Sequence, residues 1–362
     1  MKKTVDVSIP LGPIHPCFKE PARIKCQTSG ERVLSAEMEL GYMKKGIERI
    51  MKGRPWQEVM FLAERVCGIC SVIHNMVFIE ALEKISGIDL PERAALLRVI
   101  VNELDRMQSH TLANFSYCYT IEHETLAMYL LDVREKVMDL LELITGARVT
   151  CAYMVPGGVR FDLRPEDARS LSAGIDRIEA DVTRFMRMFE GGPLIATRSR
   201  GVGILTREVA LEAHAVGPTA RGSGMPETDL RLRHPTYQAL DFSPESRDEG
   251  DNYARIMVRF QEVLQSIRLI RQCLDRMTPG PVRGGGIPTE GEIAYSGEAP
   301  RGELSYFLRT DAAGRVLDIA IQTPSIMNIE ACCHYLIVDV VSIADVTSTF
   351  VSVDPCIACT ER

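Results

Sequence analysis

Two pairs of cysteines with the same spacing lie near opposite ends of the chain. Cys67 and Cys70 form one Cys-x-x-Cys pair, and Cys356 and Cys359 form the other. This spacing lets both sulfurs of a pair face one point, and thiolates are the ligands that zinc, iron–sulfur clusters, copper(I) and nickel accept. Four thiolates can therefore converge on one soft metal centre if the fold brings the two ends of the chain together.

Three kinds of site compete for these cysteines. A structural zinc site usually has its two pairs about 12–20 residues apart in a small module with little core. A thioredoxin-like redox motif needs a pair that opens a helix in a βαβ unit, and this chain has no βαβ rhythm. The third interpretation is a catalytic metal buried where the two ends of the fold meet. Spacing alone favours the third interpretation and leaves the other two open.

The residues that flank the cysteines resemble the two metal-binding motifs of nickel–iron hydrogenase large subunits. The motifs are Glu64-Arg-Val-Cys67-Gly-Ile-Cys70, followed by His74, and Asp354-Pro-Cys356-Ile-Ala-Cys359. Other segments resemble the 49-kDa quinone-site subunit of respiratory complex I: residues 12–16, 41–48, 109–110, 134–139, 145–148, 156–159 and 298–303. This combination is the mark of the energy-converting, membrane-bound hydrogenases, and the resemblance covers nearly the whole chain.

The resemblance implies a nickel–iron centre whose iron carries small diatomic ligands, cyanide and carbon monoxide. Cys67 and Cys356 would be terminal nickel ligands. Cys70 and Cys359, the second cysteine of each pair, would bridge nickel to iron. The structural alternatives for the four cysteines are a zinc ion or a misplaced disulfide.

The same resemblance suggests four further functional side chains. Arg301 would hold a guanidinium over the open face of the metal pair, as a fixed positive donor or, if transiently neutral, as a proton acceptor. Glu20 matches a glutamate that relays protons. His74, one helical turn after Cys70, would be a donor toward the site. Glu48 matches an acid that helps to hold a second, structural metal such as magnesium or iron. The ordinary alternatives are a turn salt bridge, a solvated glutamate, a core histidine and a helix-surface carboxylate.

Hydrophobic periodicity predicts the elements that must position these residues. Period-2 patterns predict strands at 4–9, on both sides of a turn at 29–31, and within 302–322. Period-3.6 patterns predict long helices at 91–115, about 120–143, 165–188, 252–277 and 327 to about 350.

The absence of an internal repeat or polar linker predicts a single domain over residues 1–362. We expect a helix-rich α+β fold of the hydrogenase large-subunit type, with an N-terminal antiparallel sheet and a central helical bundle. Its parts are N-terminal strands at 1–40, a mainly helical body at 41–300, strands at 301–325, and a helix with the second cysteine pair at 326–362.

Composition excludes several classes of protein. The chain has 362 residues, 46% of them hydrophobic, and a formal net charge of -7, which argues against disorder and against nucleic acid as a partner. Residues 1–10 contain no apolar run of a secretory signal. Asp339 and Asp345 interrupt the apolar stretch 335–346, so we expect no membrane-spanning helix. Of the eleven cysteines, we expect scattered ones to be buried, reduced thiols, namely Cys26, Cys118, Cys151 and Cys273.

The leading hypothesis is a catalytic subunit of an energy-converting nickel–iron hydrogenase. It would act on H2 through an iron–sulfur small subunit linked to ferredoxin, and membrane antiporter-like subunits would move ions. These partners would hold it at the cytoplasmic face of the membrane. The alternatives are a complex I-like subunit that reduces a quinone or another acceptor, and a zinc-stapled structural subunit.

Overall fold

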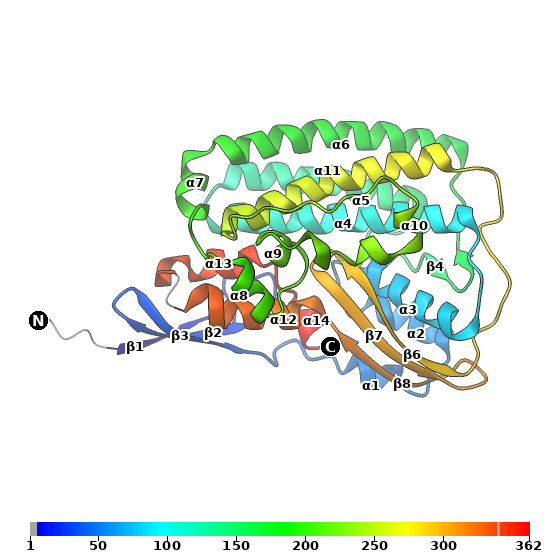
Figure 1. Cartoon of the computed structure of the whole chain (residues 1–362), viewed down its shortest axis with the longest axis horizontal. Coiled ribbons are helices and arrows are strands. Elements are labelled where there is room, and N and C mark those ends of the chain that lie inside the picture. The colour runs from blue at the N-terminus through cyan, green and yellow to red at the C-terminus, as the bar shows by residue number, and fades with distance from the viewer. Residues whose placement is uncertain (1–5, 339–340) are drawn as a thin grey trace, which may run out of the picture.

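Four long helices form the upper layer of the molecule (Figure 1). They are α4 (Glu92–Thr120), α5 (Glu124–Thr145), α6 (Pro165–Gly191) and α11 (Asn252–Arg276). Helix α4 packs against both α5 and α11, and α6 covers the same two helices. Local signals set the helix ends: Pro165 opens α6, Gly146 ends α5 in the left-handed conformation, and the Asp251 carboxylate accepts the Ala254 N–H at the start of α11.

Helix α3 (Ser71–Ser86) lies below the bundle and packs on an antiparallel sheet. The sheet has the order β6 (Gly291–Ala299), β7 (Gly302–Thr310) and β8 (Val316–Gln322). Ala299 pairs with Gly302, so Pro300 and Arg301 form the tight turn between β6 and β7. The bundle, α3 and this sheet share one apolar core.

A second apolar core joins the two ends of the chain. The N-terminal antiparallel sheet consists of β1 (Asp6–Leu11), β2 (Arg23–Ser29) and β3 (Arg32–Glu39). Against it pack the C-terminal helices α12 (Pro324–Ala331), the π-helix η3 (Cys332–Ile337) and α13 (Val346–Ser352). The chain then ends in the short helix α14 (Ile357–Thr360), close to β7 in Figure 1.

Short elements connect these layers. They are α1 (Ile47–Met51), α2 (Trp56–Glu64), β4 (Met154–Val155), β5 (Gly158–Val159), α7 (Pro193–Ser199), α8 (Arg207–Glu212), α9 (Gly217–Arg221), η1 (Pro226–Thr228), η2 (Leu230–Arg233), α10 (Pro235–Gln238) and η4 (Ile343–Asp345).

The computed structural model, which describes residues 6–338 and 341–362, confirms the predicted fold class. Residues 4–5 of the first predicted strand and Asp339 lie outside the described residues. Within those ranges, no helix has the length and apolar character needed to cross a bilayer.

The structure contains one long strand that was not predicted and breaks one predicted helix. Strand β6 lies at the end of the segment predicted to be mainly helical, and it was not predicted because an edge strand with Gly291 and Gly297 has no clean alternation of apolar residues. The helix predicted from 327 to about 350 is instead broken: α12 ends at Ala331, η3 follows, and α13 begins only at Val346.

Candidate metal centre

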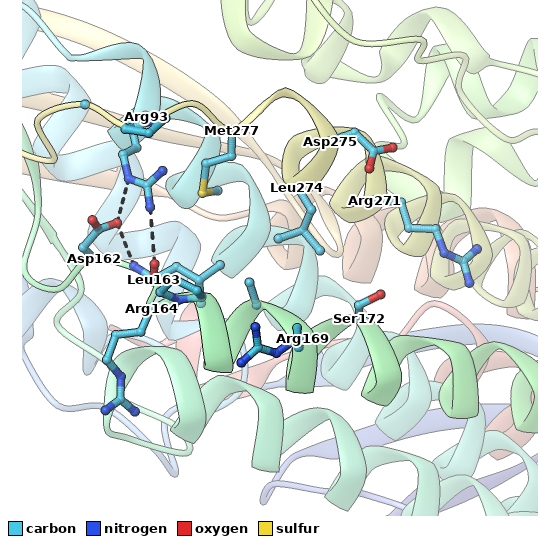
Figure 2. A pocket seen from close by; sticks show the side chains of 14 residues that line it. Arg93, Asp162, Leu163, Arg164, Arg169, Ser172, Arg271, Leu274, Asp275 and Met277 are labelled. Atoms are coloured by element: carbon cyan, nitrogen blue, oxygen red, sulfur yellow. Dashed lines mark hydrogen bonds and ion pairs between the residues drawn. The ribbon is translucent and has the colours of Figure 1, made fainter.

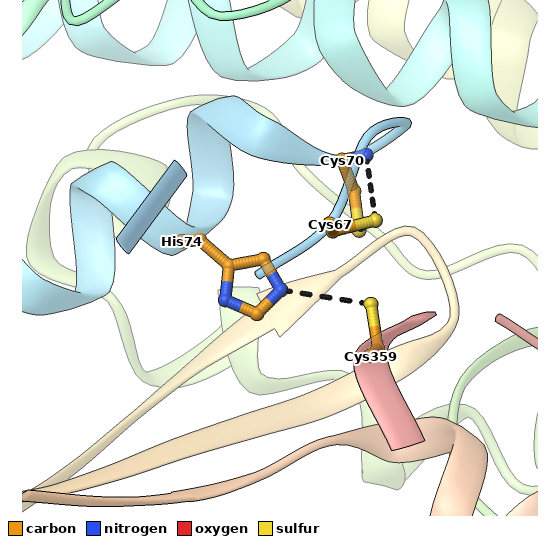
Figure 3. A group of neighbouring side chains, drawn as sticks. All are labelled: Cys67, Cys70, His74 and Cys359. Atoms are coloured by element: carbon orange, nitrogen blue, oxygen red, sulfur yellow. Dashed lines mark hydrogen bonds between the residues drawn. The ribbon is translucent and has the colours of Figure 1, made fainter. Parts of the chain in front are cut away.

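The fold brings both cysteine pairs to one buried point. Cys67 lies in the loop after α2, and Cys70 directly precedes α3. Cys356 directly precedes α14, and Cys359 lies within it. Figure 3 shows the Cys67–Cys70 loop and α14 approaching each other from opposite sides, with His74 beside them. All four cysteines are at most 3% exposed, so the predicted convergence of the two ends of the chain is present.

The sulfur atoms are close but not bonded to one another. The Sγ atom of Cys67 lies 2.9 Å from that of Cys70 and 3.6 Å from that of Cys356. Both distances far exceed the roughly 2.05 Å of a disulfide bond, and all four cysteines are free. Potential ligand atoms of Cys67, Cys70, His74 and Cys359 all lie within 4.8 Å of one another. This group can bind a metal ion.

The electrostatics of the four thiols fit a bound cation. Burial opposes ionisation of Cys67, but hydrogen bonds with the Cys356, Cys359 and Cys70 thiols and the charge of Arg301 lower its pKa well below its ordinary value. Hydrogen bonds with its neighbours, and burial, raise the pKa of Cys359 well above the usual range. The pKa values of Cys70 and Cys356 are also raised well above the usual range. Protein groups alone therefore favour a thiolate at Cys67 only, and a soft cation supplies the charge that four thiolates need.

His74 lies in the first turns of α3, one turn after Cys70, and is fully buried. Its Nε2 atom lies 3.9 Å from Cys359 Sγ, and its Nδ1 atom lies 2.8 Å from the hydroxyl of Tyr306 on β7. Burial, the largest cause, lowers the pKa of His74 to about 4. The imidazole is therefore neutral at physiological pH.

Arg301 reaches the site from the β6–β7 turn. Its Nε donates to the main-chain oxygen of Asp354 at 2.8 Å, and its Nη1 donates to Ser109 Oγ at 3.2 Å. Its Nη2 lies 3.0 Å from Asp354 Oδ2, an ion-pair distance without an aligned hydrogen bond. Burial disfavours the charge, but Asp354 and the thiols of Cys70, Cys356 and Cys67 raise the pKa of Arg301 well above its ordinary value.

A close backbone contact fixes the turn that carries Arg301. Gly217 has φ +63°, and a Cβ atom there would lie 2.3 Å from the carbonyl oxygen of Arg301. Gly302 has φ +124°, and a Cβ atom there would lie 2.6 Å from the amide nitrogen of Gly217. Only glycine permits this approach, so the two residues clamp the turn against the start of α9.

Asp354 is the principal site residue that the sequence did not single out. It is completely buried, has φ 54°, and contacts the Lys19 ammonium as well as Arg301. Burial raises its pKa, but the charges of Arg301, Lys19 and Arg259 outweigh burial and lower the pKa below the usual range. Its position two residues before Cys356 was the available signal, whereas its left-handed backbone and its cationic partners could not be read from the sequence.

Glu20 lies beside the backbone of the second cysteine pair. Its Oε2 atom accepts the backbone N–H of Ala358 at 2.8 Å, and Ala358 lies between Cys356 and Cys359. The side chain is half-buried and contributes to raising the pKa of Cys356. The structure thus places Glu20 against the second cysteine pair.

Glu48 contacts the C-terminal residue Arg362 and lies apart from the four cysteines. Its Oε1 atom accepts from the backbone N–H of Ile321 at 2.7 Å and from the Arg362 guanidinium at 2.9 Å. Among residues 6–338 and 341–362, Glu48 belongs to no group of three or more His, Cys, Asp or Glu ligand atoms. The role of Glu48 in holding a second metal stays a prediction, and the structure places the Arg362 guanidinium against its carboxylate.

Other features do not belong to this centre. A surface hollow of about 910 Å³ lies between the start of α6 and the end of α11. Arg93 pairs there with Asp162 at 2.8 Å, and Figure 2 shows the side chains that line the hollow. None of the predicted site residues lines it.

The scattered cysteines are buried and free, as predicted: Cys26, Cys118, Cys151 and Cys273.

Comparison with known proteins gives the class of this site. Residues 121–287 and 282–362 match the family of the respiratory-chain NADH dehydrogenase 49 Kd subunit, and residues 45–119 match nickel-dependent hydrogenase. The chain therefore belongs to the family that comprises complex I 49-kDa subunits and nickel–iron hydrogenase large subunits.

Individual relatives span nearly the whole chain. The carbon monoxide-induced hydrogenase of Rhodospirillum rubrum is 36% identical over 98% of this chain and 99% of its own. An F(420)H(2) dehydrogenase component of Methanosarcina mazei is 32% identical over 100% of this chain and 99% of its own. The alpha chain of the membrane-bound hydrogenase of Pyrococcus furiosus is 34% identical over 98% of this chain and 87% of its own.

Proposed function

We propose that this chain is the catalytic subunit of an energy-converting nickel–iron hydrogenase that forms and oxidises H2 reversibly. The observation that carries the proposal is the convergence of four buried, free cysteines at one point, with Cys67 Sγ 2.9 Å and 3.6 Å from two of the others. Two of the similar proteins named above are hydrogenases, which supports the same conclusion.

The four cysteines would hold nickel, and Cys70 and Cys359 would also hold an iron that carries cyanide and carbon monoxide. When bound, this pair of metals would supply the redox-active, coordinatively open centre that H2 chemistry requires. The donor set fits, because a thiolate-rich site selects soft metals and because burial excludes water from these ligands.

Arg301 would act as a fixed positive donor at the open side of the centre. Its raised pKa argues against the alternative role of proton acceptor, because the guanidinium would have to lose a proton beside Asp354 and the thiols. Asp354 and Ser109 would hold the guanidinium plane in one orientation. Such a preorganised donor stabilises developing negative charge without reorganising during the reaction.

Glu20 would relay protons between the second cysteine pair and solvent. Its carboxylate already contacts the backbone between Cys356 and Cys359 and is half-buried, so it lies between the buried centre and the surface. A carboxyl group at such a boundary can accept a proton from one side and release it to the other.

The partners would be an iron–sulfur small subunit, ferredoxin acting through it, and membrane antiporter-like subunits. The chain would then be a peripheral subunit on the cytoplasmic face of the cell membrane. Support comes from the Pyrococcus furiosus relative, whose name describes a membrane-bound hydrogenase, and from the absence of a spanning helix among the described residues.

Metal content separates this proposal from its alternatives. The complex should be purified without oxygen and assayed for nickel, iron and zinc per chain, together with viologen-linked H2 oxidation. Nickel near one per chain with H2 activity supports the proposal. A complex I-like subunit would reduce its acceptor without nickel, and a structural subunit would contain one zinc.

A further inference from the structure

A buried tyrosine hydroxyl contacts the histidine of the metal centre. Tyr306 lies on β7 and is completely buried. Its hydroxyl is 2.8 Å from His74 Nδ1, and the two rings meet edge to face with centroids 5.9 Å apart. The other ring nitrogen of His74, Nε2, lies 3.9 Å from Cys359 Sγ. The imidazole therefore links a phenol on one side to a candidate metal ligand on the other.

Hydrogen-bond accounting decides which nitrogen of His74 carries the proton. The ring is buried and no carboxylate is among its hydrogen-bond partners in residues 6–338 and 341–362, so its neutral form, with a single N–H, is favoured. Over the same residues, His74 Nδ1 is the sole hydrogen-bond partner of the Tyr306 hydroxyl.

A proton on Nδ1 would point at the hydroxyl oxygen and leave the buried hydroxyl hydrogen without an acceptor, which is unfavourable. A proton on Nε2 satisfies both groups, because the hydroxyl then donates to the Nδ1 lone pair. The Nε2–H is directed toward Cys359 in that arrangement.

We propose that Tyr306 is a positioning residue that holds His74 as the Nε2–H tautomer, so that the imidazole donates an N–H···S hydrogen bond to Cys359. The effect on a metal ligand rests on the proposed function, because it requires Cys359 to bind metal as a thiolate. A donor to a thiolate ligand stabilises its negative charge and withdraws electron density from the metal. Tyr306 would thus tune the centre without touching it.

The same helix–sheet interface offers a matched control. Tyr295 is the direct cross-strand partner of Tyr306 on β6. Its hydroxyl donates to Glu80 Oε2 at 3.0 Å instead of to His74. Replacing either tyrosine by phenylalanine removes one hydroxyl and keeps the ring, so only the Tyr306→Phe variant removes the contact with His74.

Nitrogen NMR of the full chain, labelled with 15N at histidine and purified without metal, tests the tautomer directly. A His74→Gln variant assigns the resonances of His74. Wild type and Tyr295→Phe should both show His74 protonated at Nε2, and Tyr306→Phe should shift the signals toward a mixture of tautomers. A wild-type signal from the Nδ1–H form, or an unchanged signal in Tyr306→Phe, would overturn the proposal.

Infrared spectra of the intact complex test the consequence for the metal. The stretching frequencies of the diatomic ligands on iron should shift in Tyr306→Phe and stay at wild-type values in Tyr295→Phe. Identical spectra in all three proteins would overturn the tuning role. A complex without nickel would refute the proposed function instead, and the NMR result would still decide the tautomer.

Discussion

Replacing Arg301 by lysine asks whether the geometry of the guanidinium, and not only its charge, serves the reaction. Arg301 donates to the Asp354 carbonyl at 2.8 Å and to Ser109 at 3.2 Å. Lysine keeps the positive charge but has one flexible ammonium in place of a planar fork. Hydrogen bonds that involve a charged group contribute about 1.5–3 kcal/mol each, so losing two removes about 3–6 kcal/mol of orienting energy.

We expect the Arg301→Lys variant to lose about 10²–10³-fold in turnover, the usual effect of removing one preorganised donor. The assay is viologen-linked H2 oxidation at saturating H2, with nickel and iron measured on the same sample. Arg283→Lys is the matched control, because Arg283 donates to the carbonyls of Val159 and Arg160 rather than to groups at the centre. Wild-type turnover in a fully metal-loaded Arg301→Lys variant would refute the reasoning.

Three further substitutions test separate parts of the mechanism and the fold. Glu20→Gln should lower H2 turnover about 10²-fold while nickel content stays unchanged, because it removes a proton-exchanging group and no metal ligand. Cys359→Ser should abolish nickel binding, measured by elemental analysis, because it removes a bridging thiolate from the donor set. Glu64→Gln should raise the free energy of unfolding at pH 8 by up to about 3 kcal/mol and leave it nearly unchanged at pH 4, measured by guanidinium denaturation.

The sign of the Glu64 effect follows from burial, which raises the pKa of this carboxyl to about 7. Between about pH 4.5 and pH 7 the folded chain keeps a proton that the unfolded chain releases, so stability falls as pH rises through this range. A glutamine carries no such penalty. An equal gain at both pH values would contradict this explanation.

Two control variants distinguish the effects of Glu20→Gln and Cys359→Ser from a general loss of structure. Glu37→Gln changes an exposed glutamate on β3 and should leave turnover intact; an equal loss in both glutamine variants would remove the case for Glu20. Cys273→Ser changes a buried cysteine on α11, which lies outside the group of candidate ligands, and should keep its nickel. Nickel retained by Cys359→Ser would exclude that cysteine as an essential ligand.

The helical body could be predicted because its signals are local. Apolar residues recur at helical spacing along α4, and proline or glycine marks the ends of α5 and α6. Strand β6 was missed because it is an edge strand that contains Gly291 and Gly297 and lacks a clean alternation of apolar residues. No proline or glycine marks the break after Ala331 in the sequence.

The site was only partly predictable for a related reason. The spacing of paired cysteines indicates metal binding, so Cys67 and Cys359 could be proposed as metal ligands before their convergence was known. Asp354 matters through its contact with Arg301, which lies more than fifty positions away in the sequence. Tyr306 matters through its contact with His74, which lies on another element. No periodicity encodes such contacts.

Metal analysis of the anaerobically purified complex, with H2 activity measured on the same sample, tests the central claim most directly. We predict nickel near one per chain, iron in excess of nickel because of the partner's clusters, and viologen-linked H2 oxidation. One zinc per chain, without nickel and without H2 activity, would contradict the assignment of this chain as a hydrogenase catalytic subunit.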